Sequence, residues 1–289
     1  MLSLHTNNAA LSAQNAIGRT QSSLSTSMTR LSTGYRINSA MDDAAGLQIA
    51  TRLKAQTSGM AVAMRNTQNS TSMLQTAEGA LDEVSNMLIR MKDLATQAAD
   101  ASSTTADKTA MQSEYDALGK ELNNVLKNTT FAGSKLLDGG TLQTGALTFQ
   151  IGASSSETMS LDLTAGMTGV SGAVATATAK YSAPTATAAG TEITTSANAT
   201  TAITNLSTAL DKVGTLRSDL GAAANRLEHV YNNLSNISTN SKAAMGRIMD
   251  VDFAAESANM TSNQMLLQAS TAMLKQSNSM SSMVMSLLQ

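Results

Sequence analysis

LQTAEGALDEVSNMLIRMKDLATQA, residues 74–98, is the stretch of sequence that decides the fold. Its apolar residues step by three and four positions, which places them along one narrow face of an α-helix. The members of this stripe are Leu74, Ala77, Leu81, Val84, Leu88, Met91, Ala95 and Ala98. Because such a face has to be buried against another helix, the stretch predicts one part of a coiled coil or helical bundle.

The same rhythm returns far downstream, at Val213, Leu216, Leu220, Ala223, Leu227, Val230, Leu234 and Ile237. The matching faces predict a mainly α protein, in which both chain ends form a long antiparallel coiled coil or helical-bundle rod. A further helix is indicated by the spacing of Met111, Tyr115, Leu118, Leu122 and Val125.

The middle of the chain follows a different pattern. Leu147, Phe149 and Ile151 alternate with polar residues, and so do Met159, Leu161 and Leu163, which predicts a small β-hairpin with one buried face. Residues 165–201 are mostly Ala, Thr, Ser and Gly, so we expect an exposed connection there with little capacity for a core.

The two terminal segments carry weaker apolar stripes in a Ser, Thr, Asn and Gln background. The stripe residues are Leu11, Ile17, Leu24 and Leu31 near the start and Leu266, Met273, Met280 and Leu287 near the end. Isolated helices are marginal in water, so we expect both segments to be disordered in a free monomer and to fold on assembly. Periodicity alone favours a plainer interpretation, the core of a monomeric or small oligomeric helical protein.

Composition narrows the classes of function. Only 2% of the 289 residues are aromatic, the net charge is −2 and the basic residues are scattered, which argues against binding of nucleic acid. No apolar run approaches the length of a membrane helix, and the first residues lack the pattern of a cleaved signal peptide. The chain has no cysteine, no His-Glu-x-x-His helix and no phosphate-binding loop, so we expect no catalytic residue, metal or cofactor.

Several separated segments resemble bacterial flagellin. They are RLSTGYRINSAMDDAAG at residues 30–46, QTAEGAL at 75–81, GRIMDVDFAAE at 246–256 and SLLQ at 286–289. The resemblance covers roughly residues 1–163 and 204–289, in the order and spacing of the family.

The resemblance implies a structural subunit of the helical flagellar filament, exported unfolded without a cleaved signal peptide and polymerised at the filament tip. Residues 1–44 and 250–289 would form an inner coiled-coil domain. Residues 45–175 and 200–249 would form a helical rod with the hairpin, and residues 176–199 a variable surface-exposed tip. The implied partners are other subunits, the export apparatus, an export chaperone that binds the C-terminal helix, and the cap and hook-junction proteins. Phrases such as SLHTN at residues 3–7 are similar to lateral, swarming-type flagellins.

Three sets of site residues follow. The terminal stripes listed above are the candidates for packing in the filament core. A mixed-charge zone, made of Arg30, Arg36, Asp42, Asp43 and Arg52, either sets subunit register through ion pairs or is a solvated helix face. The third set matches positions through which immunostimulatory flagellins engage a vertebrate receptor: Arg90, Asp93, Leu94, Gln97 and Glu114. Asp93 stands where that motif usually has Glu, and the alternative role of this face is ordinary rod surface or filament contact.

Other classes of protein remain as alternatives at this point. A hook–filament junction protein resembles flagellin at both ends but caps rather than polymerises. An enzyme displayed on a filament would need a metal motif, and a translocator that inserts in membranes would need a long apolar hairpin; the sequence has neither.

Overall fold

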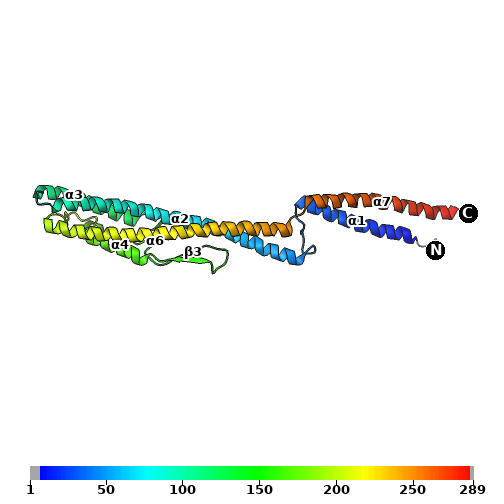
Figure 1. Cartoon of the computed structure of the whole chain (residues 1–289), viewed down its shortest axis with the longest axis horizontal. Coiled ribbons are helices and arrows are strands. Elements are labelled where there is room, and N and C mark those ends of the chain that lie inside the picture. Colours follow the sequence, from blue (N-terminus) through cyan, green and yellow to red (C-terminus); the bar gives the residue numbers. More distant parts are fainter. Residues whose placement is uncertain (1–6, 287–289) are drawn as a thin grey trace. The chain divides into compact units, whose positions relative to one another are not determined.

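The computed structural model describes residues 7–286, and side chains for residues 7–280. It is mainly helical, with two small antiparallel hairpins in the middle of the chain, which confirms the predicted fold class (Figure 1). The helices are α1 (Asn8–Thr33), α2 (Ala44–Ala99), α3 (Thr105–Asn128), α4 (Thr164–Ala177), α5 (Ala179–Ser182), α6 (Ser196–Met249) and α7 (Phe253–Ser286). The strands are β1 (Thr130–Phe131), β2 (Ser134–Lys135), β3 (Leu147–Gln150) and β4 (Thr158–Leu161).

The chain divides into two compact units. Unit 1 comprises residues 1–57 and 239–289, and unit 2 comprises residues 58–238. These divisions differ from the predicted boundaries at residues 44–45 and 249–250, because α2 and α6 each contribute residues to both units. The filament layers named above stay a prediction.

Unit 2 holds a continuous apolar core built from the stripes that the sequence predicts. All eight positions of the 74–98 stripe are buried, and on α6 the stripe is buried from Val213 to Leu227. Val230 is half-buried and Leu234 is buried in a smaller second cluster with Met60 and Ala63, whereas Ile237 is exposed. Arg217 of α6 reaches Glu78 at 3.4 Å and Asp82 at 2.9 Å, which joins the polar edges of α2 and α6.

The predicted hairpin is present and its register is regular. Leu147 pairs with Leu161 and Phe149 with Met159, so these apolar residues share one face. Met159 is buried against the helical core and Phe149 packs at its edge. The shorter β1–β2 hairpin turns at Ala132 and Gly133, both with positive φ.

The expectation that residues 165–201 have little capacity for a core is wrong. This tract contains α4 and α5, and Met167, Val170, Val174 and Ala177 of α4 are all buried in the core of unit 2. Their spacing of three and four positions gives α4 a buried stripe, while the residues between them are small. Tyr181 and Ile193 are buried as well, so the predicted surface-exposed tip at 176–199 is exposed only in part.

A buried polar clasp, made of Gln112, Asp116, Lys180 and Glu192, holds this tract against α3. The Gln112 amide donates to Asp116 Oδ1 and to Glu192 Oε2, both at 2.8 Å. Lys180 Nζ lies 3.9 Å from Asp116 Oδ2 and donates to the carbonyl oxygens of Ala186, at 2.9 Å, and Ala188. The charges of Asp116 and Lys180 are buried but paired, as buried charges need to be, whereas Glu192 is half-buried.

In unit 1, α1 and α7 pack as an antiparallel pair. Asn7 Nδ2 donates to the Ser277 carbonyl at 3.2 Å, and Arg30 lies 3.7 Å from Glu256 at the other end of the pair. On α1 the less exposed residues repeat with heptad spacing: Ala10, Ala13, Ile17, Thr20, Leu24, Ser27 and Leu31. On α7 the corresponding residues are Glu256, Met260, Asn263, Leu267, Ser270, Leu274 and Ser277. We call these two rows the α1–α7 seam.

The loops after α1 and before α7 are fastened to one another. Gly34 ends α1 in the left-handed conformation, and its carbonyl accepts from Val251 N at 3.0 Å. Arg36 N donates to the Met249 carbonyl at 2.6 Å, and its guanidinium donates to the Ile248 carbonyl at 3.0 Å. These bonds bring together two segments that lie more than two hundred residues apart in the sequence.

Candidate functional site

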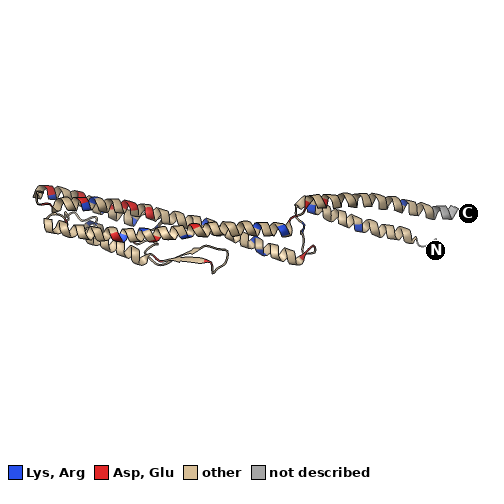
Figure 2. Cartoon of the chain, in the orientation of Figure 1, with Lys and Arg blue, Asp and Glu red and all other residues tan. Residues whose placement is uncertain are grey.

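The faces of α1 and α7 outside the seam are the candidate functional site, because they leave large apolar side chains uncovered. The exposed residues are Leu11, Met28, Met265, Leu266, Met273 and Met280. Charged residues are sparse on both helices: Arg19 and Arg30 on α1, and Glu256 and Lys275 on α7 (Figure 2). The surface is therefore suited to apolar contact rather than to electrostatic attraction.

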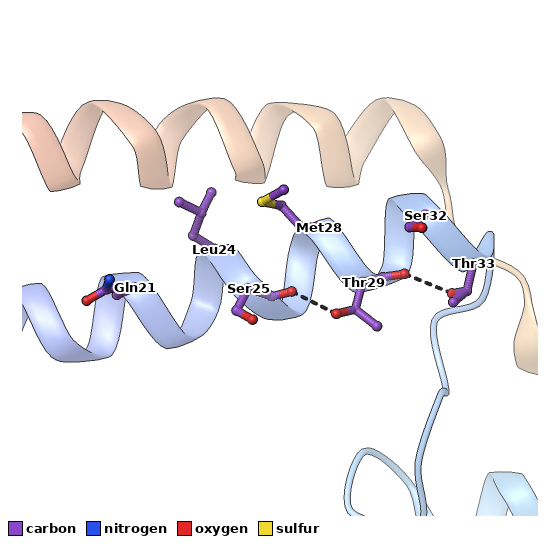
Figure 3. Close-up of a pocket in the computed structure, with 7 residues that line it drawn as sticks. All are labelled: Gln21, Leu24, Ser25, Met28, Thr29, Ser32 and Thr33. Carbon is purple, nitrogen blue, oxygen red and sulfur yellow. Dashed lines mark hydrogen bonds between the residues drawn. The ribbon is translucent and has the colours of Figure 1, made fainter.

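A groove runs along α1 beside α7, and Figure 3 shows its lining. Leu24 and Met28 project toward the side of α7. The Thr29 hydroxyl donates to the Ser25 carbonyl at 3.0 Å, and the Thr33 hydroxyl donates to the Thr29 carbonyl at 2.9 Å. Because these two hydroxyls already form hydrogen bonds within the helix, a partner in the groove needs to form fewer hydrogen bonds than the number of polar lining residues indicates.

The predicted core stripe of α1 is placed partly in the seam. Ile17, Leu24 and Leu31 are half-buried there, whereas Leu11 is exposed. On α7 the predicted register is off by one residue: Leu267 and Leu274 lie in the seam, while Leu266, Met273 and Met280 are exposed. Leu287 lies outside the described residues. Burial of the exposed set by neighbouring subunits stays a prediction.

Most of the mixed-charge residues have partners within the chain. Arg30 faces Glu256 across the seam, and Arg36 bonds the Ile248 carbonyl. Asp42 accepts from the backbone N–H groups of Ser39 and Asn38, which holds the pKa of its carboxyl below the usual range. Asp43 Oδ1 accepts from Gly46 N at 2.8 Å and caps the start of α2, and Arg52 is exposed. These local roles were not predictable from the pattern of charges.

The residues predicted to contact a receptor do not form one exposed set. Arg90 and Glu114 form an exposed ion pair at 2.6 Å, and Asp93 and Gln97 are also exposed. Leu94, in contrast, is 3% exposed and belongs to the core of unit 2. The assignment of Leu94 as a contact residue is therefore wrong for this conformation, because a buried side chain cannot meet a partner.

Among the described residues, no cluster of three or more metal-ligating side chains occurs. None of the described helices combines the length and hydropathy that a membrane span requires.

These features define a class: a mainly helical protein whose two chain ends pair in one antiparallel seam and leave apolar faces open. Two family models match the chain. The bacterial flagellin N-terminal helical region matches residues 4–141, and the bacterial flagellin C-terminal helical region matches residues 203–288. The chain belongs to the bacterial flagellin family.

Individual proteins similar to the chain are flagellins as well. Polar flagellin F of Vibrio parahaemolyticus is 48% identical over 162 residues, which are 56% of this chain and 42% of that protein. B-type flagellin of Pseudomonas aeruginosa is 48% identical over 162 residues, covering 56% of this chain and 33% of that protein. The matched stretch thus spans less than half the length of either relative.

Solved structures similar to the chain include Bacillus cereus flagellin, which is 32% identical with a TM-score of 0.46. The match covers 63% of this chain and 94% of that chain. A putative flagellar hook-associated protein from Vibrio parahaemolyticus has a TM-score of 0.55 at 16% identity, covering 72% of this chain and 100% of that one. At that identity the likeness concerns the fold alone.

Proposed function

We propose that the chain is a structural, non-enzymatic subunit of the bacterial flagellum, and that copies self-assemble into an extracellular helical filament. Identical subunits that associate through heterologous contacts without closing into a ring form an open filament of this kind. Family membership supports the proposal, and one structural observation carries it.

That observation is the lack of an apolar core in unit 1. Among its described residues, the buried apolar side chains are Ile37 and Ala50, while the large apolar residues of α1 and α7 stay half-buried or exposed. Burial of apolar surface is the main driving force of folding, so this helix pair lacks the means to hold together alone. Contact with other copies would supply the missing burial.

The proposal also includes partners other than copies of the chain. An export chaperone would use the exposed apolar face of α7 before assembly, and the export apparatus, cap and hook-junction proteins would handle the subunit around that step. Arg90, Asp93, Gln97 and Glu114 remain candidates for contact with a vertebrate receptor, since their side chains are exposed on unit 2.

The test is polymerisation of the purified full chain, seeded with filament fragments and observed by sedimentation and electron microscopy. We expect long filaments from the unaltered protein. A protein that only caps seeds, as a hook-junction protein would, or one that stays monomeric, would overturn the proposal.

A paired variant tests the apolar face. Leu266→Asp would place a carboxylate in an apolar contact, which costs on the order of several kcal/mol, so filaments should be lost while unit 2 stays folded. Gln268→Asp, an exposed position on another side of α7, is the matched control and should polymerise. Equal loss in both variants would show that the apolar face is not what assembly requires.

A further inference from the structure

The described methionines range from buried to exposed, and Met64, Met73, Met87, Met245, Met249 and Met260 are half-buried between the two extremes. In unit 2, Met60, Met91, Met111, Met159 and Met167 are buried. Five others are more than half exposed: Met28 (56%), Met41 (97%), Met265 (60%), Met273 (70%) and Met280 (52%). An oxidant in solution therefore meets a defined subset of thioethers.

Four of these five lie on the candidate functional site. With about 100° per residue, Met265, Met273 and Met280 fall within an arc of about 80° on one side of α7. That side is distinct from the one that carries Leu267 and Leu274 of the seam. Met28 lines the groove of α1 together with Leu24 (Figure 3). Met41 lies apart, in the turn before α2.

We propose that Met28, Met265, Met273 and Met280 form an oxidation site that controls self-association of the free subunit. The inference rests on the proposed function, because it requires that these faces be buried between copies. The reactant is hydrogen peroxide: its O–O bond breaks, one oxygen is transferred to the thioether sulfur, and the other leaves as water with both hydrogens. Sulfur loses the two electrons that reduce the peroxide, and the product is methionine sulfoxide.

The sulfoxide changes what the face can bind. An apolar, flexible side chain becomes a polar one with a strong hydrogen-bond acceptor, and its burial then carries a desolvation penalty. Four sulfoxides on two helices with few charged residues would turn the apolar faces into polar ones. Subunits already assembled would be protected, since the same sulfur atoms would be covered by neighbours.

The experiment treats the purified full-length chain with hydrogen peroxide, maps the sulfoxides by mass spectrometry and then measures seeded polymerisation. We expect oxidation at Met28, Met41, Met265, Met273 and Met280 before the buried methionines of unit 2. The association constant for subunit addition should fall by about tenfold or more, and about tenfold corresponds to about 1.4 kcal/mol. Polymerisation should return after treatment with methionine sulfoxide reductases.

Two variants assign the effect to the site. In the combined variant Met28→Leu, Met265→Leu, Met273→Leu and Met280→Leu, the four thioethers are replaced by apolar side chains that peroxide does not oxidise, so polymerisation with peroxide should equal polymerisation of the same variant without it. Met41→Leu removes the most exposed thioether away from the helices and should remain as sensitive as the unaltered protein.

The outcomes separate the two proposals. Failure of the untreated protein to polymerise overturns the proposed function. Normal polymerisation of the fully oxidised protein, or a combined variant that stays sensitive to peroxide, overturns the oxidation site while the proposed function stands.

Discussion

The side chain of Leu94 lies in the core of unit 2, while Asp93 and Gln97 beside it face outward. It follows Met91 by three positions, which is one of the two intervals that the rest of the stripe uses. The adjacent Ala95 is buried too, so the stripe at this point is two residues wide. The predicted stripe continues from Met91 to Ala95 and therefore omits Leu94, although leucine is the larger apolar residue.

Leu94→Ala should therefore act on stability. Removal of a fully buried leucine side chain costs about 2–5 kcal/mol, so the midpoint of denaturant unfolding should fall clearly. Ile89→Ala, at a half-exposed position of the same helix, should cost less than about 1 kcal/mol. Unchanged stability of Leu94→Ala would contradict the buried position.

Tyr115 is a second residue whose surroundings determine its chemistry. Its side chain is fully buried, and its hydroxyl donates to the Ala177 carbonyl at 2.7 Å. Burial, with the nearby charges of Glu192 and Asp116, raises the pKa of the phenol well above its ordinary value. The folded state thus keeps a proton that the unfolded chain releases near pH 10.

Stability should fall as pH rises above about 10. In that window the unfolded state binds fewer protons than the folded state, which lowers the free energy of unfolding by about 1.4 kcal/mol per pH unit for each such tyrosine. Tyr115→Phe loses one hydrogen bond but should show a shallower alkaline decline. Parallel declines for the two proteins, followed by circular dichroism, would count against this role for Tyr115.

At the scale of single elements, α3 and α5 meet where only a glycine fits. A Cβ at Gly119 would lie 2.5 Å from Thr178 Oγ1 and 3.1 Å from Lys180 Cβ. The close approach places Lys180 beside Asp116 in the polar clasp. At Gly79 of α2, in contrast, an added Cβ would meet no atom within 4 Å.

Two glycine-to-alanine changes should consequently have opposite signs. Gly79→Ala should stabilise unit 2 by about 0.5–1 kcal/mol, because alanine is the better helix former. Gly119→Ala should destabilise it by about 1–3 kcal/mol, because the methyl group overpacks the contact with Thr178 and Lys180. Thermal unfolding of both variants measures the difference, and stabilisation by Gly119→Ala would contradict the packing described.

The helices differ in how well the sequence predicts their buried faces. The stripes of α2 and α6 were predictable because large apolar residues repeat there over many turns. On α7 the register was not, since Leu266 and Leu267 are adjacent, as are Met273 and Leu274, and only contact with α1 decides which of each pair turns inward. The α4 helix was missed because its buried Met167, Val170 and Val174 are few among Ala, Gly and Thr.

At the scale of the whole molecule, the two units differ in what they bury. Unit 2 has a core that draws on five helices and the β3–β4 hairpin, whereas the α1–α7 seam is made largely of small and polar residues such as Ala13, Ser27 and Ser270. The polar clasp could not be foreseen, because its four members come from positions up to 80 residues apart, as the Gln112–Glu192 bond shows.

Hydrogen–deuterium exchange should report this difference in the free protein. Amides of α1 and α7 should exchange about a hundredfold faster than those of residues 74–98, because local opening requires little loss of apolar burial. In assembled protein the two sets should become comparable. Slow exchange in α1 and α7 of the monomer would mean that the pair is stable by itself.

The threonines of α1 carry one more consequence. Thr20, Thr29 and Thr33 each turn the hydroxyl back onto a carbonyl of the preceding turn. The group that each threonine presents to its surroundings is therefore chiefly a methyl group. Hydropathy scales assume a solvated hydroxyl, so they underestimate the apolar character of this helix. Valine, which keeps the shape and the methyl, is the replacement that such a surface should accept most readily.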